Sequence, residues 1–144
     1  MNWKRIIIAG VVFAIVSQIL RTVESYATLN YYMDPDYFGV WSKVMMPTAG
    51  PPPAEFFYVS VASAVIIGII YAAVYALFNK NLTSKTIFRK GLEYGLILFF
   101  MVQIPSLLGM YLLINLPTML IVYWGISGLV ISLVVGIIFA KIIK

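Results

Sequence analysis

Residues 6–16 read IIIAGVVFAIV, an uninterrupted apolar run that begins directly after the basic pair Lys4-Arg5. Extended to about residues 3–23, this run is long enough to cross a hydrocarbon core, since about 20 apolar residues span a thickness of about 30 Å. Three further segments have the same character, at about 56–79, 91–115 and 118–140. The sequence therefore predicts four membrane-spanning helices.

The composition of the whole chain agrees with this prediction. Of its 144 residues, 62% are hydrophobic and only 10% are charged, which is too little polar surface to cover a soluble domain of this size. We interpret residues 1–144 as one all-α integral membrane domain, a four-helix bundle. The first segment is expected to be a span and not a signal peptide, because no small-x-small cleavage pattern precedes Arg21.

The residue types that the chain lacks narrow its chemistry. It has no cysteine and no histidine, so thiolate nucleophiles, iron–sulfur clusters and ordinary zinc, copper or haem ligation are not expected. The net charge of +5 does not indicate nucleic acid, because the basic residues stand at segment ends and form no patch interleaved with aromatics. We expect no cofactor, no metal and no nucleic-acid partner.

Basic residues are divided unevenly between the two sides that four crossings create. Eight of the ten Lys and Arg residues fall near the termini or in the 80–90 loop, and only Arg21 and Lys43 fall on the opposite side. The positive-inside rule then predicts a multi-pass protein of the cell membrane with both termini in the cytoplasm. The long loop at residues 24–55 is expected outside.

This outer loop contains the sequence DPDYFGVWSKVMMPTAGPPP at residues 34–53. Asp34 suits a helix N-cap and Pro35 the first helical position, so a short amphipathic helix is predicted over residues 37–46, lying in the outer interface. The loop either anchors and seals the outer end of the bundle, or acts as a lid or docking surface. The interfacial residues of the predicted helix are Tyr37, Phe38, Trp41 and Met45.

Polar residues recur at helical spacing on one face of the first segment, namely Ser17, Gln18, Arg21 and Glu24. A polar group that faces lipid costs several kcal/mol, so this face is expected to point into the bundle or to the outer interface. Arg21 and Glu24, three residues apart, are placed to form an ion pair. We expect these side chains to contribute to assembly and stability and not to perform chemistry.

The third segment supplies partners for that face, because Gln103 and Ser106 flank Pro105. The proline removes one helical hydrogen bond and is expected to kink the helix near mid-membrane. Two interpretations follow. Either Gln18 and Gln103 join the helices by a hydrogen bond, or these residues line a wet or ligand-lined crevice.

A carboxylate also lies within the third segment, near its cytoplasmic end. Glu93 follows Arg89 by four residues, so the two side chains are placed to neutralise each other. A lone intramembrane carboxylate otherwise indicates a functional site, for example the proton-coupling group of a carrier.

The opening Met1-Asn2-Trp3-Lys4-Arg5-Ile6, followed by a helix that contains Gly10, resembles a loose group of small, uncharacterised bacterial four-helix integral membrane proteins. The resemblance covers most of the chain and implies the four-helix fold. It implies no activity, cofactor or site residue.

Three functions follow from these patterns. The first is a non-catalytic accessory or structural subunit of a larger membrane complex, or a homo-oligomer, assembled through small-residue helix faces such as Gly91-x-x-x-Gly95. Its partners would be membrane lipids and other membrane subunits or a second copy. The alternative is a small carrier or channel for a solute or ion, with Arg21 and Glu24, or Glu93, lining the path. A lipid-modifying enzyme is the third, and we do not expect it, because no two carboxylates share one predicted depth.

Overall fold

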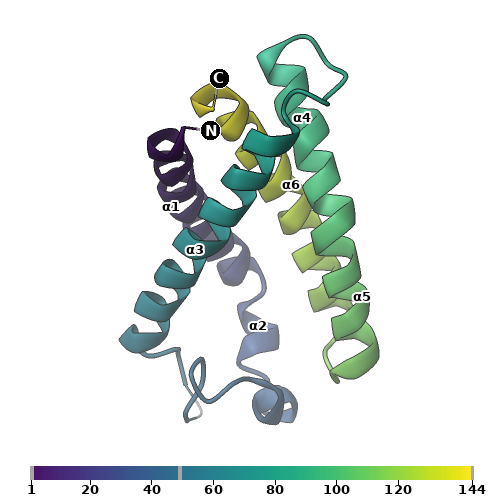
Figure 1. Cartoon of the computed structure of the whole chain (residues 1–144). Helices are drawn as coiled ribbons and strands as arrows, with labels where there is room; N and C mark the ends of the chain where they lie inside the picture. Colours follow the sequence, from purple (N-terminus) through teal and green to yellow (C-terminus); the bar gives the residue numbers. More distant parts are fainter. Residues whose placement is uncertain (1, 49, 144) are drawn as a thin grey trace.

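The computed structural model describes residues 2–48 and 50–143, and these form an all-α bundle (Figure 1). Within the described residues, four helical stretches are long and apolar enough to cross a membrane. The fold-class prediction is therefore confirmed, and the chain is a small multi-pass membrane protein in its helical layout. The four stretches are α1 (Trp3–Ala27), α3 (Ala54–Phe78), the span Ile87–Leu113, which contains α4 and α5, and α6 (Thr118–Ile142).

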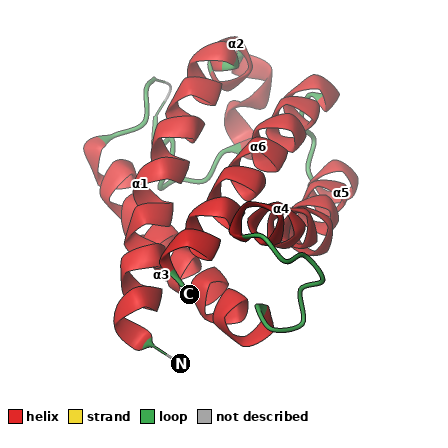
Figure 2. Ribbon diagram, turned by 90° about the horizontal axis from the view of Figure 1, so that it is seen from above, coloured by secondary structure: helices red, strands yellow, loops and turns green. Residues whose placement is uncertain are grey.

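The bundle has two distinct ends. The described residues nearest both termini lie together with the 79–86 loop, and we call this the terminal end (Figures 1 and 2). At the opposite end, which we call the loop end, a long connection runs from α1 to α3 and a short link at residues 114–117 joins α5 to α6. The first of these connections contains α2 (Leu29–Tyr32) and a short helix, η1 (Pro35–Val40).

The third span is interrupted in its middle. After α4 (Ile87–Leu98), the chain makes a π-helical turn at Phe99–Gln103 before α5 (Ile104–Leu113) begins, and the backbone N–H of Ile104 donates to the carbonyl of Phe99. Pro105 has no N–H, and its ring would collide with the carbonyl four residues earlier in a regular helix. The expected effect of Pro105 therefore takes the form of a widened π turn directly before it.

The helices approach most closely where small residues meet. In α4 and α6, a Cβ added to Gly136 would collide with the carbonyl oxygen of Gly91 and lie 2.8 Å from the backbone nitrogen of Gly95. Between α1 and α3, a Cβ added to Gly68 would lie 2.6 Å from the carbonyl oxygen of Gly10. The small-residue faces are thus used for contacts inside the chain, where they allow backbone to pack against backbone.

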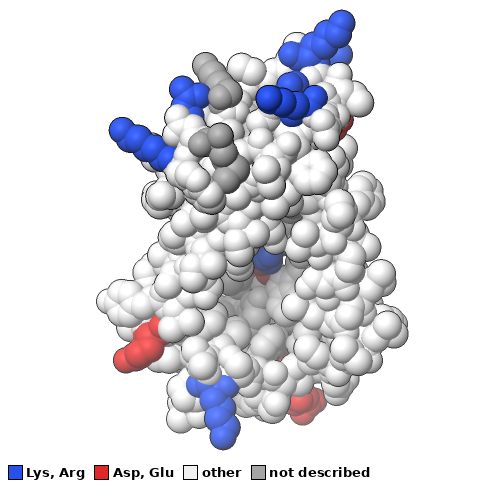
Figure 3. All heavy atoms as spheres, in the orientation of Figure 1, with Lys and Arg blue, Asp and Glu red and all other residues white. Residues whose placement is uncertain are grey.

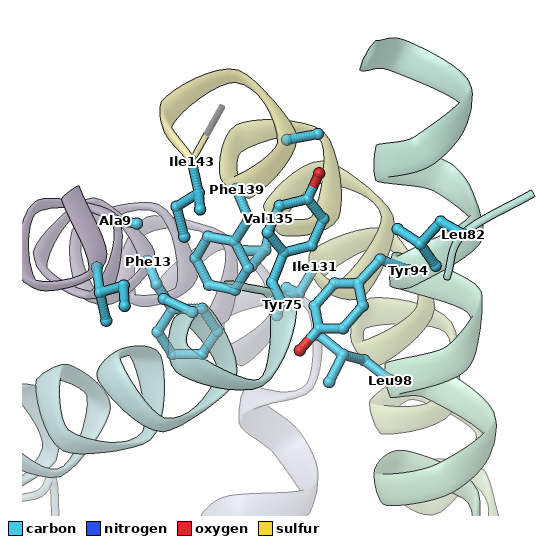
Figure 4. Packing of buried hydrophobic residues seen from close by; sticks show 13 residues of the cluster. Ala9, Phe13, Tyr75, Leu82, Tyr94, Leu98, Ile131, Val135, Phe139 and Ile143 are labelled. Carbon is cyan, nitrogen blue, oxygen red and sulfur yellow. The ribbon is translucent and has the colours of Figure 1, made fainter. Parts of the chain in front are cut away.

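A buried cluster fills the terminal end of the bundle (Figure 4). The rings of Tyr75, Tyr94 and Phe139 lie with their centroids 5.0–6.5 Å apart, and the Tyr94 hydroxyl donates to the carbonyl of Tyr71 at 2.7 Å. This end of the bundle is therefore packed closely. The cluster consists of Ile6, Ala9, Phe13, Ala72, Tyr75, Leu82, Tyr94, Leu98, Ile131, Val135, Phe139, Ala140 and Ile143.

The helix predicted over residues 37–46 is correct at its start and wrong in type and extent. The Asp34 side chain accepts the N–H of Asp36 at 3.0 Å and Pro35 follows it, as expected of an N-cap. The segment is, however, the 3₁₀ helix Pro35–Val40, and the backbone of Trp41 is extended. The tertiary contacts of Trp41 override the local helical pattern here, and Ser42 starts a separate turn in which its hydroxyl oxygen accepts the N–H of Met45.

Candidate functional site

A cavity of about 710 Å³ lies between the helices toward the loop end. Its walls come from α1, α3, the third span and α6, and eight residues of the α1–α3 connection line it at the loop end. Its volume falls within the range of about 300–1,000 Å³ that is typical of small-molecule sites. The eight lining residues of the connection are Leu29, Tyr32, Met33, Trp41, Met45, Met46, Pro51 and Pro52.

The cavity exists because α3 does not pack on α5, the part of the third span nearer the loop end. Helix α3 packs on α1, α4 on α6 and α1 on α6, whereas α3 and α5 are not a packed pair. Figure 3 shows the molecule hollowed on the face between them, with basic and acidic atoms inside the hollow. At this level the facing helices carry small or polar side chains, Ser60 and Ser63 on α3 and Ser106 on α5, which do not fill the space.

The lining changes character along the length of the cavity. Near the loop end it contains Arg21, Glu24, Ser25, Tyr32, Trp41 and Trp124. In its middle, at similar distances from the helix ends, lie Ser17, Gln18, Ser60, Ser63, Gln103 and Ser106. Toward the packed terminal end it is lined by Phe13, Ile67, Tyr71, Leu98, Ile131 and Val135. The end of the cavity that carries its charged side chains, which we call the polar end, thus also has Met and Pro residues, whereas the other end is largely apolar.

The charged residues of the lining form one ion pair. Arg21 Nη1 donates to Glu24 Oε2 at 3.4 Å, and the Glu24 side chain is only 8% exposed, against 43% for Arg21. The hydroxyls of Thr28 and Ser127 also lie 3.2 and 3.4 Å from the Glu24 carboxylate, but each shares its one proton with a closer backbone carbonyl, at 2.9 Å (Glu24) and 3.3 Å (Trp124). Glu24 is thus enclosed by polar groups, whereas the Arg21 side chain lines the cavity and is 43% exposed.

The two glutamines of the polar face do not bond to each other. Gln18 Oε1 accepts the Ser60 hydroxyl from α3 at 3.4 Å, and Gln103 lies against Gly128, where an added Cβ would come within 2.6 Å of the Gln103 side chain. The suggested Gln18–Gln103 hydrogen bond is therefore wrong. Both glutamines line the cavity from different walls, because the missing contact between α3 and α5 leaves space at their level.

Three aromatic side chains connect the α1–α3 connection to α6. The indole Nε1 of Trp124 donates to the Tyr32 hydroxyl at 2.8 Å, and the rings of Tyr32, Trp41 and Trp124 lie 5.1–6.5 Å apart. Burial, together with the nearby Glu24 carboxylate, raises the pKa of Tyr32 above its usual value of 10, so its hydroxyl stays protonated. Among the described residues, Trp41 Nε1 is a buried side-chain donor without a hydrogen-bond partner.

The sequence pattern does not identify Trp124, Ser60 or Ser127 as residues of the site. A tryptophan near a membrane end predicts only an interfacial ring, and serines in a span are common. The polar face of α1 could be recognised from the sequence, and its residues Ser17, Gln18, Arg21 and Glu24 do line the cavity. Of the predicted interfacial residues, Trp41 and Met45 line the cavity and Tyr37 and Phe38 are half-buried outside it.

Glu93 lies outside the cavity and is not paired with Arg89. Its carboxylate accepts the backbone N–H groups of Thr83 and Ser84 at 2.9 and 3.0 Å, and the Thr83 hydroxyl at 3.1 Å. The predicted ion pair is therefore not formed, because the 79–86 loop folds back and brings two amide donors to the carboxylate. Glu93 fixes this loop onto α4.

The cavity offers little for acid–base or metal chemistry. Glu24 is the one acidic residue among its described lining residues, and within residues 2–48 and 50–143 no three carboxylates come together in a way that would hold a metal ion. No protein-family model matches the chain, and no curated protein or solved structure is detectably similar to it.

Proposed function

We propose that the chain is a non-catalytic membrane protein that binds an amphiphilic small molecule, which enters the cavity sideways from the lipid. The observation that carries the proposal is the cavity of about 710 Å³, which has its charged side chains toward one end and a largely apolar lining at the other, and which is hollowed on the face between α3 and α5. In a membrane this face meets lipid, so an amphiphile would reach the cavity without crossing water.

A permanently open channel fits the structure less well. The cluster around Tyr75, Tyr94 and Phe139 fills the terminal end, and Glu93 does not line the cavity. A carrier would need a second conformation in which this cluster separates. We therefore favour one-sided binding over conduction.

The accessory-subunit interpretation stays a prediction. Its main support was the set of small-residue helix faces, and Gly91, Gly95 and Gly136 already pack against each other within the chain. If the chain is an accessory subunit, a helix of its partner would bind between α3 and α5.

The binding proposal predicts that the purified protein retains an amphiphile that a filled cavity excludes. Ser63 is exposed and lines the cavity, so Ser63→Phe places a ring in the space, whereas the exposed neighbour Ala62 is not a lining residue and Ala62→Phe serves as the matched control. Native mass spectrometry after gentle extraction should show a bound small molecule on the parent protein and on Ala62→Phe, and none on Ser63→Phe. Equal retention by all three, or a second polypeptide in place of the small molecule, would contradict the proposal.

The orientation follows from the basic residues and is a further prediction. We expect the terminal end in the cytoplasm and the cavity toward the outer leaflet, because eight of the ten basic residues of the sequence fall near the chain termini or in the 80–90 loop. The chain has no cysteine, so Ser42→Cys should react with an impermeant thiol reagent added outside intact cells, and Lys85→Cys only after lysis. The reverse pattern would invert the assignment.

A further inference from the structure

At the polar end of the cavity, more hydrogen-bond donors than acceptors are left without a partner in the protein. The hydroxyls of Thr22 and Ser25 donate to carbonyl oxygens of α1, at 2.8 Å in both cases. The Glu24 carboxylate accepts from Arg21 and shares the hydroxyl protons of Thr28 and Ser127 with backbone carbonyls. The carboxylate is therefore largely satisfied by the protein itself.

The donors, in contrast, are not used up. A guanidinium carries five N–H groups, and the Arg21 side chain, 43% exposed, makes one 3.4 Å contact with Glu24. Trp41 Nε1 lies on the same cavity lining, buried and without a partner among the described residues. Both side chains therefore carry a donor for which the described residues supply no acceptor oxygen.

The depth of Arg21 matches that of a lipid headgroup. It lies 18 residues after Trp3, the first residue of α1, which corresponds to about 27 Å along a helix, near the far boundary of a hydrocarbon core about 30 Å thick. Phe13, Ile67 and Leu98 lie deeper and continue the cavity with an apolar lining. A charged head at Arg21 with a chain directed toward these residues fits this gradient.

We infer that the amphiphile is anionic, with a carboxylate or phosphate that binds Arg21 and Trp41 and a hydrocarbon chain in the deeper part of the cavity. This inference rests on the proposed function. Arg21 is the one cation among the described lining residues, and guanidinium binds carboxylate and phosphate oxygens in charge-assisted hydrogen bonds. Glu24 competes for the same guanidinium, so its charge limits the affinity for the anion.

The test compares three ligands with the same brominated chain, a fatty acid, a lysophosphatidic acid and an uncharged monoacylglycerol. The protein carries Trp3→Phe and is reconstituted in phosphatidylcholine vesicles at mildly alkaline pH, so that the acids are ionised. Trp41 and Trp124, which line the cavity, then report binding through quenching by bromine. We expect one or both anions to bind about 10- to 100-fold more tightly than the monoacylglycerol, the ratio that a charged hydrogen bond provides. Tighter binding of the fatty acid would identify a carboxylate ligand, and tighter binding of the lysophosphatidic acid a phosphate ligand.

Two variants separate this role from a structural one. Glu24→Gln keeps an acceptor for Thr28 and Ser127 but removes the competing charge, so anion affinity should rise while monoacylglycerol affinity stays unchanged. The double variant Arg21→Gln/Glu24→Gln leaves no stranded buried charge, and there the preference for anions should disappear.

Two results would overturn the inference. If the monoacylglycerol binds the parent protein as tightly as the anions, and the double variant changes nothing, the headgroup assignment is wrong while amphiphile binding stands. If none of the three ligands quenches a protein that is shown by its thermal unfolding to be folded, amphiphile binding itself is wrong as well.

Discussion

Gly136→Ala is expected to destabilise the bundle by about 2–3 kcal/mol, the range of severe overpacking. The added methyl group would collide with the carbonyl oxygen of Gly91 and lie 2.8 Å from the nitrogen of Gly95. These are backbone atoms of α4, which cannot move aside as a side chain does by changing its rotamer. Helices α4 and α6 must therefore separate. The destabilisation is expected even though alanine has a higher helix propensity than glycine, a preference worth up to about 1 kcal/mol.

Gly109→Ala is the matched control for this substitution. Gly109 lies inside α5, and a Cβ added there meets nothing within 4 Å, so the same change should leave stability unchanged or raise it slightly. Reversible unfolding in mixed micelles, followed by circular dichroism, gives the free energy of unfolding for both variants. Similar stability of the two variants would show that α4 and α6 do not pack as described.

Trp124→Ala is expected to release the α1–α3 connection from the bundle. The substitution removes the hydrogen bond from Trp124 Nε1 to Tyr32 and the ring contacts of Trp124 with Tyr32 and Trp41. Together these are worth about 2–3 kcal/mol, which corresponds to a rise of about 30- to 150-fold in the population of the open loop. The connection would then behave as a lid held by an aromatic contact.

Accessibility of residue 46 measures this opening. Met46 is 8% exposed and lines the cavity, so Met46→Cys should react slowly with a thiol reagent, and about 30- to 150-fold faster when Trp124→Ala is added. Trp3→Ala makes the same change at a side chain that is 57% exposed at the terminal end, and it should leave the rate unchanged. Equal rates in the Trp124 and Trp3 variants would show that the connection is held elsewhere.

The chain's sequence alone determined those features that depend on near neighbours along the chain. The four spans follow from their length and hydropathy, and the 3₁₀ helix begins where Asp34 and Pro35 favour a helix start. The Arg21–Glu24 pair follows from a spacing of three residues on one helix. In each case the interacting groups are fixed by helical geometry, so no knowledge of the other helices is needed.

Only the tertiary structure decided which helices touch and which do not. Small residues occur in every span, so their pattern cannot show that α1 pairs with α3 and α4 with α6 while α3 and α5 stay apart. The hydrogen bond from Trp124 to Tyr32 joins residues 92 positions apart, and Glu93 bonds to a loop that folds back over α4 instead of to Arg89. Such partners depend on how each helix is rotated and spaced against the others. That arrangement is set by backbone packing at the glycines of the whole bundle, and it leaves the cavity open between α3 and α5.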